Sequence, residues 1–216
     1  KDYKGDTTMT AGEAFDPTPA NIDARTVRSE LPSGMKLALL PKATRGQTVS
    51  GTIRLHFGTE QALSGKATTA SLAGAMLMRG TTAHTRLQLK DEFDRLKAQV
   101  GVRGTAEGVT VGFTRVRGNL PVVRRLAGEV LRQASFDSTE FVTLQRERLA
   151  ALESQRTDPI ALAQTALARA TQAYAPGHPR YVSTIEERIA NTQAVPVADA
   201  RRFWVEFYGV GAGEAA

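Results

Sequence analysis

Residues 66–81, KATTASLAGAMLMRGT, decide the fold that we predict for this chain. Alanine, leucine and methionine favour a helix, and the larger apolar residues recur at i, i+1, i+4 and i+5, a spacing that places them on one face. These residues are Leu72, Ala73, Met76 and Leu77. Arg79 and Gly80 then form a typical C-terminal stop. We therefore expect an amphipathic helix that ends just before Thr81.

The opposite face of this predicted helix carries only small residues. Ser71, Gly74 and Ala75 are spaced i, i+3 and i+4, so they stand a turn apart on one side. Two histidines and a glutamate at this spacing could hold and use a metal ion. Serine, glycine and alanine cannot do so. We therefore expect these three positions to be non-catalytic, and we assign no catalytic, cofactor-binding or metal-binding residue in the chain.

The composition excludes several kinds of site. The 216 residues contain no cysteine, which rules out disulfides, thiolate zinc sites and a cysteine nucleophile. The formal net charge is +6, but the arginines are scattered among acids, no basic run exceeds two residues, and no nucleic-acid-binding motif is present. No apolar run reaches the roughly 18 residues of a membrane span. We expect neither nucleic-acid binding nor a membrane span.

The segments around the opening stretch alternate between strands and helices. We predict a hairpin over 26–42 with a turn at 32–34, a strand over 49–57, and a strand pair around Glu107 and Gly108. A capping box of Thr85 and Gln88 predicts a helix that continues to Val100. Further helices are expected over 119–131, 137–152, 158–174, 184–190 and 197–208, whereas 209–216 is too rich in small residues to predict an element.

This order of elements predicts an α+β fold, in which helices pack on one face of an antiparallel-rich sheet. We interpret residues 1–24, which lack periodicity and contain glycine and proline, as a linker. Residues 25–216 then form a single domain, which we expect to be a fragment of a longer chain.

The succession of features resembles one family, the pitrilysin/insulinase-like zinc peptidases with the inverted motif H-x-x-E-H. The stretch MLMRGT over 76–81 matches the context that follows this motif, and LPSGMKLALLP over 31–41 is similar to the opening strands of the family. His178 with Pro179, and an A-x-x-F-x-x-x-x-Y pattern that ends at Tyr208, resemble the later part of the domain. The resemblance covers about residues 25–210.

The resemblance implies a mitochondrial processing peptidase-like metallohydrolase fold without its metal site. Aligned on the Gly-Thr pair, the first histidine of the motif falls on Ser71, the glutamate on Gly74 and the second histidine on Ala75. A further glutamate ligand is expected about 75 residues downstream, within 148–153, where Glu153 is the candidate remnant. One carboxylate cannot hold zinc alone.

The resemblance therefore implies a non-catalytic domain of a zinc-dependent metalloendopeptidase, forming part of the substrate chamber and the scaffold. Zinc would sit in a catalytic domain of the same chain or of a partner subunit, where a motif glutamate activates the water that attacks the peptide bond. The implied partners are that domain and a peptide substrate, and the implied location is periplasmic or extracellular in a bacterium. The alternative is a structural or assembly subunit of the same family without any peptidase activity.

Other residues that suggest chemistry have simpler interpretations. His56, His84 and His178 are not at spacings that preassemble a metal site, and we expect structural or surface roles for them. The glycines between 101 and 118 lack the lysine and hydroxyl residue of a phosphate-binding loop, so we attribute them to turns and close strand packing. Ser71 is not part of a nucleophile elbow.

Overall fold

A computed structural model describes residues 11–216, apart from the side chains of 115–117. Its strands are β1 (Val27–Glu30), β2 (Lys36–Leu39), β3 (Thr48–His56), β4 (Gln99–Gly104), β5 (Gly108–Val116) and β6 (Gly213–Ala215). The α-helices are α1 (Pro19–Arg25), α2 (Glu60–Leu63), α3 (Ala67–Met76), α4 (Arg86–Arg95), α5 (Leu120–Arg132), α6 (Ser138–Gln155), α7 (Pro159–Thr171), α8 (Ile185–Ala194) and α9 (Val197–Phe207).

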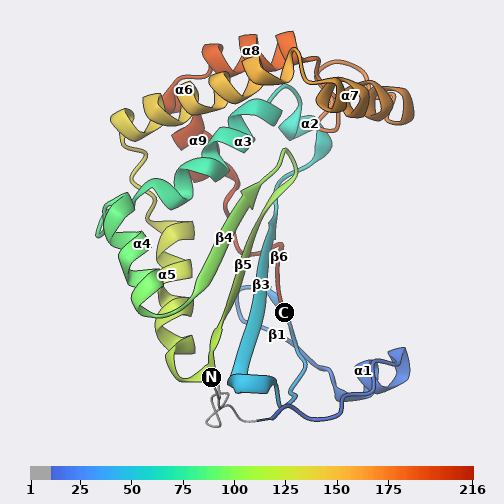
Figure 1. Cartoon of the computed structure of the whole chain (residues 1–216), viewed down its shortest axis with the longest axis vertical. Helices are drawn as coiled ribbons and strands as arrows, with labels where there is room; N and C mark the ends of the chain where they lie inside the picture. The colour runs from blue at the N-terminus through green and yellow to red at the C-terminus, as the bar shows by residue number, and fades with distance from the viewer. Residues whose placement is uncertain (1–10) are drawn as a thin grey trace, which may run out of the picture.

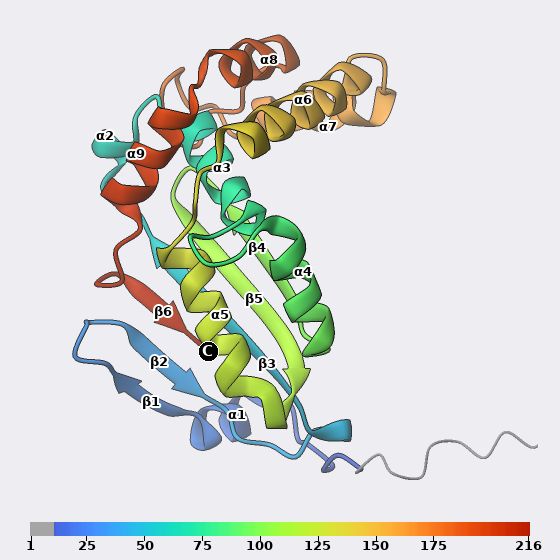
Figure 2. The same cartoon turned by 90° about the vertical axis from the view of Figure 1, so that its left-hand side faces the viewer.

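The described strands form one sheet in the order β1-β2-β6-β3-β5-β4. Neighbouring strands are antiparallel except β2 and β6, which are parallel. Helices α4 and α5 lie along one face of β3, β4 and β5, and α6, α7 and α8 form a further group beyond α3 at one end of the sheet (Figures 1 and 2). The predicted α+β architecture, with helices on one face of an antiparallel-rich sheet, is confirmed.

Strand β3 shows how the sequence determines the two faces of the sheet. Ile53 and Leu55 point towards the helices, and Leu55 is buried. The alternate residues Thr52, Arg54 and His56 are exposed. Because side chains alternate between the faces of a strand, the predicted alternation over 49–57 becomes a sheet with one apolar face and one polar face.

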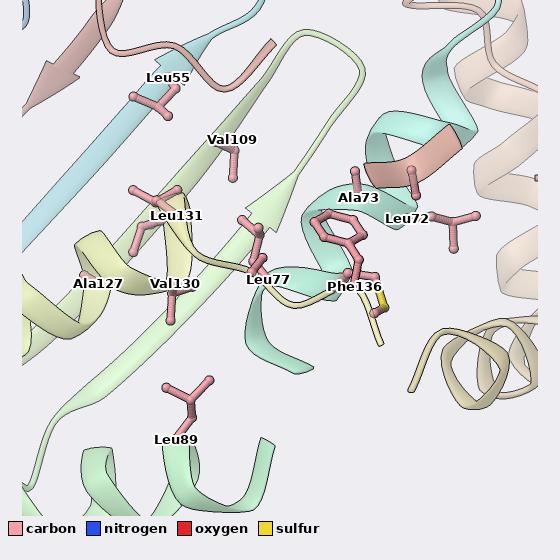
Figure 3. Packing of buried hydrophobic residues seen from close by; sticks show 14 of the residues in the cluster. Leu55, Leu72, Ala73, Leu77, Leu89, Val109, Ala127, Val130, Leu131 and Phe136 are labelled. Carbon is pink, nitrogen blue, oxygen red and sulfur yellow. The ribbon is translucent and has the colours of Figure 1, made fainter. Parts of the chain in front are cut away.

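Helix α3 lies at the centre of the core. Leu72, Ala73, Met76 and Leu77 are at most 1% exposed, as the spacing of apolar residues predicted. Figure 3 shows Leu77 in the same group of buried side chains as Val130 of α5 and Val109 of β5, so the core joins residues from three separate parts of the chain. The helical turn after Met76 is a 3-10 turn over Leu77–Arg79, and Gly80 ends it with a φ of 130°.

Most of the predicted helix starts are also confirmed. The capping box of Thr85 and Gln88 is present at the start of α4, and the carboxylate of Asp137 accepts hydrogen bonds from two backbone amides of α6. Asp158 caps α7 in the same way. Short polar side chains accept hydrogen bonds from amides that have no partner within the helix. Because this depends on residue type and position, such caps can be predicted from the sequence.

Three parts of the structure differ from the sequence prediction. Helix α4 ends at Arg95, and Val100 belongs to β4 rather than to this helix, because Lys97 adopts a φ of 50° and turns the chain. The end of the chain forms β6 between β2 and β3, although its composition predicted no element. Helix α1 forms inside the predicted linker 1–24, whose first ten residues lie outside the described part.

Helix α9 closes the core through aromatic side chains. Phe203 is 3% exposed, and its ring meets that of Phe57 at the end of β3 edge to face, with 5.2 Å between the centroids. Phe203 also stacks on Phe207, at 4.5 Å. Such pairs add to the free energy gained from burial of the rings alone.

We predict that Phe203→Ala lowers the free energy of unfolding by about 3–5 kcal/mol, because it removes a buried ring and leaves a cavity. The control is Val205→Ala on the same helix, where the side chain is 71% exposed and a change of about 0.5 kcal/mol or less is expected. Urea unfolding followed by circular dichroism measures both. Equal losses in the two variants would contradict this account of α9.

Candidate functional site

The three motif positions on α3 do not share one pocket. Ser71 borders a cavity of about 610 Å³, and Gly74 is buried against β4. Ala75 is partly buried and packs against the core. Nothing at these positions offers a metal ligand, so the residues present do not fit a zinc ion.

Gly74 is the most constrained of these positions. A Cβ atom added to Gly74 would lie 2.5 Å from the Cα of Gly104, and one added to Gly104 would lie 2.8 Å from the Cα of Gly74. Real Cβ atoms do not approach backbone atoms so closely. Helix α3 and strand β4 therefore touch backbone to backbone, and a glutamate side chain at position 74 has no room. The sequence prediction placed Gly104 in close strand packing, but its neighbour is a helix.

Tyr208 lies beside this contact. Its hydroxyl is 3.5 Å from the place that a Gly74 Cβ would occupy, and it has no hydrogen-bond partner among the described residues. Burial raises the pKa of Tyr208 well above its usual value. The polar side chain beside position 74 is therefore a neutral phenol, which is a poor metal ligand.

The residues after α3 that carried the family resemblance have structural roles here. The Thr81 hydroxyl donates to the carboxylate of Glu129 on α5 and accepts from the His84 amide at 2.9 Å. His84 Nδ1 lies 2.7 Å from the same carboxylate. Burial opposes ionisation of Glu129, but these hydrogen bonds prevail and hold the pKa of its carboxyl below the usual range.

Arg79 anchors the same turn to α6. Its side chain is 9% exposed, lies 3.3 Å from a carboxylate oxygen of Glu140 and also pairs with Glu147. A buried guanidinium needs such partners because an unpaired buried charge is costly. The 79–81 turn thus fixes the end of α3 by polar contacts to α5 and α6.

The other candidate residues do not converge. His56 lies 3.6 Å from Glu214, His84 pairs with Glu129, and His178 lies 2.9 Å from Glu60. In the described part of the chain no three histidine, aspartate or glutamate side chains come together in an arrangement that could hold a metal ion. Glu153, the expected remnant ligand, is exposed on α6 and pairs with Arg156 at 3.2 Å.

The cavity beside Ser71 contains residues that the sequence prediction missed. It lies between α3, α6, α7 and the segment leading into α8, and its lining includes Arg148, Thr165 and Arg188. A larger cavity of about 940 Å³ lies between α4 and the sheet at Gly101 and Gly112, and it includes none of the motif positions. No simple motif marks Arg148 and Arg188, which are 40 residues apart and meet only through packing of α6 on α8.

Comparison with known proteins identifies the fold. No family model matches the sequence, and no curated protein matches it. Among solved structures, the peptidase M16 inactive domain from Pseudomonas fluorescens superposes with a TM-score of 0.69 at 18% identity. A protease from Helicobacter pylori gives 0.73 at 13% identity, and the first half of the periplasmic protease PqqL from Escherichia coli gives 0.70 at 16%.

These superpositions each include 88% of the present chain. The chain therefore has the fold of a peptidase M16 domain, the fold that the pitrilysin resemblance predicted. It spans 45%, 45% and 42% of the three matched chains, so it corresponds to less than half of each. None of the described helices has the length and hydrophobicity needed to cross a membrane.

The Gly74 contact predicts that alanine substitution at two helical glycines changes the free energy of unfolding in opposite directions. Gly74→Ala should lower the free energy of unfolding by about 1–3 kcal/mol, because the added methyl group pushes α3 off β4. Gly128→Ala on α5, where an added Cβ meets nothing within 4 Å, should raise it by about 0.5–1 kcal/mol through helix propensity alone. Chemical denaturation measures both, and stabilisation by Gly74→Ala would contradict the backbone contact.

Proposed function

We propose that this chain is the non-catalytic domain of a larger zinc-dependent metalloendopeptidase, in which it forms scaffold and part of the wall of a substrate chamber. The observation that carries the proposal is the lack of space at position 74. The chain has a peptidase M16 fold and contains the helix α3, but Gly74 packs on Gly104 where a motif glutamate would need space. Zinc and the groups that use it then belong to another domain of the same chain or to a partner subunit.

The polar face of the sheet supports the role in a chamber wall. Helices cover the opposite face, whereas residues such as Thr52, Arg54 and Arg103 are exposed (Figure 2). This face is hollowed by a cavity of about 570 Å³ that is bordered by Arg54, Lys36 and Glu214 among others. Charged side chains on this face can form hydrogen bonds and ion pairs with a peptide.

The matched structures support both the class and the compartment. One of them is described as an inactive domain of peptidase M16, and another as half of a periplasmic protease. We extend the first description to this chain because its motif positions are Ser71, Gly74 and Ala75. By the same comparison we propose a periplasmic or extracellular setting in a bacterium for the parent protein.

The test is zinc content and peptidase activity of the purified chain. After incubation with zinc and removal of free metal, elemental analysis should find far less than one zinc per chain, and an internally quenched peptide should stay intact. Treatment with a chelator should leave the thermal unfolding midpoint unchanged, because no metal contributes to folding. Tight binding of one zinc per chain would overturn the proposal.

The full reading frame separates the proposal from a purely structural subunit of the same family. An H-x-x-E-H motif in the adjoining domain, together with chelator-sensitive cleavage by the complete protein, is expected. A complete protein that lacks this motif and cleaves no peptide would favour the structural or assembly role.

A further inference from the structure

Two arginines line the cavity of about 610 Å³ beside Ser71. Arg148 comes from α6 and Arg188 from α8, and both are half-buried. Hydroxyl groups of Ser71, Thr165 and Ser183 border the same space. The cavity therefore brings together two guanidinium groups and several hydroxyls from helices that are distant in sequence.

The two guanidinium groups have little compensation within the described part of the chain. Arg188 donates one hydrogen bond, to the Thr165 hydroxyl at 3.3 Å, while its buried Nε has no partner there. Arg148 takes part in no hydrogen bond or ion pair with any described residue. Burial, and secondarily the positive charge of Arg188, lower the pKa of Arg148.

Neighbouring arginines show that carboxylates are available in this helical layer. Arg156 at the end of α6 pairs with Glu153 at 3.2 Å, and Arg169 on α7 lies 3.9 Å from Glu187. Two like charges held together in a half-buried space without such a partner are unfavourable for the empty domain. An anionic ligand would remove that penalty.

The charge of the lining favours a singly charged anion. Arg148 and Arg188 contribute two positive charges, and Asp158 contributes one negative charge while it caps α7, which leaves a net charge of +1. Guanidinium groups bind carboxylates through paired hydrogen bonds with matched geometry. Ala67, Ala161 and Ala168 are also part of the lining and can pack against the carbon chain that bears such a group.

We propose that Arg148 and Arg188 form a carboxylate-binding site that holds a peptide by its C-terminal carboxylate or by an acidic side chain. The inference rests on the proposed function only for the source of the carboxylate, a peptide in the chamber. Ser71 places the site beside the helix face where the family resemblance puts metal ligands. A face that would hold a cation in a catalytic domain thus holds an anion here.

Three short peptides of equal length test the site and separate the two sources. Acetyl-Ala-Ala-Ala with a free C-terminal carboxylate, acetyl-Ala-Glu-Ala-amide and the neutral acetyl-Ala-Gln-Ala-amide are titrated into the chain and followed by NMR chemical shifts or calorimetry. We expect at least one carboxylate peptide to bind at least tenfold more tightly than the neutral peptide. Equal affinities for all three would overturn the site.

Substitutions then assign the binding to the two arginines. Arg148→Gln and Arg188→Gln should each weaken carboxylate binding about tenfold or more, as expected for loss of a charge-assisted hydrogen bond, and Arg148→Lys should restore part of it. The control Arg146→Gln removes an exposed charge from the same helix and should leave the affinity within about twofold, since an exposed charge is screened by salt. An equal loss in the control would overturn the assignment.

The thermal unfolding midpoint distinguishes a binding role of Arg148 from a structural one. Substitution of a structural residue would lower the midpoint, whereas substitution of a binding residue should not. Arg148→Gln removes a half-buried, unpaired charge, so the unfolding midpoint of the empty domain should stay equal or rise while carboxylate affinity falls. A lower midpoint together with unchanged affinity would show that Arg148 only supports the fold. Stoichiometric zinc in the chain would overturn the proposed function without altering the peptide affinities, so the two failures are distinguishable.

Discussion

The contact on which the rest of the structure depends is the approach of α3 to β4 at Gly74 and Gly104. Neither position can carry a side chain, so the helix and the strand touch through backbone atoms. This sets the depth at which Leu72, Ala73 and Leu77 enter the core, and it leaves the outer side of α3 available to α6 and α8. The same contact leaves no room for a glutamate side chain at position 74.

Polar contacts then hold this arrangement from the other end of α3. Arg79 pairs with two carboxylates of α6, and Thr81 with His84 holds Glu129 of α5. Both elements that flank the motif helix are therefore tied to the turn that ends it. The turn thus joins three helices through polar contacts. The stretch that resembles the peptidase family therefore has a structural role in this domain.

The arginines of the helical layer differ in whether they pair with a carboxylate. In the layer formed by α6, α7 and α8, Arg156 pairs with Glu153 and Arg169 lies 3.9 Å from Glu187. Arg148 and Arg188 pair with no carboxylate among the described residues, although Asp158 borders the same cavity. The proposed anionic ligand would offset this excess of positive charge.

The sequence by itself determined helix α3, the caps of α4, α6 and α7, and the two faces of β3, because these follow from local spacing and residue chemistry. It also shows that Ser71, Gly74 and Ala75 carry no strong metal-binding side chain. It did not reveal β6, whose small residues become a strand only between β2 and β3. It also missed the end of α4, where a left-handed Lys97 outweighs the apolar periodicity. The Gly74–Gly104 contact and the Arg148–Arg188 cavity join residues 30 and 40 positions apart, so only the tertiary packing of separate elements decided them.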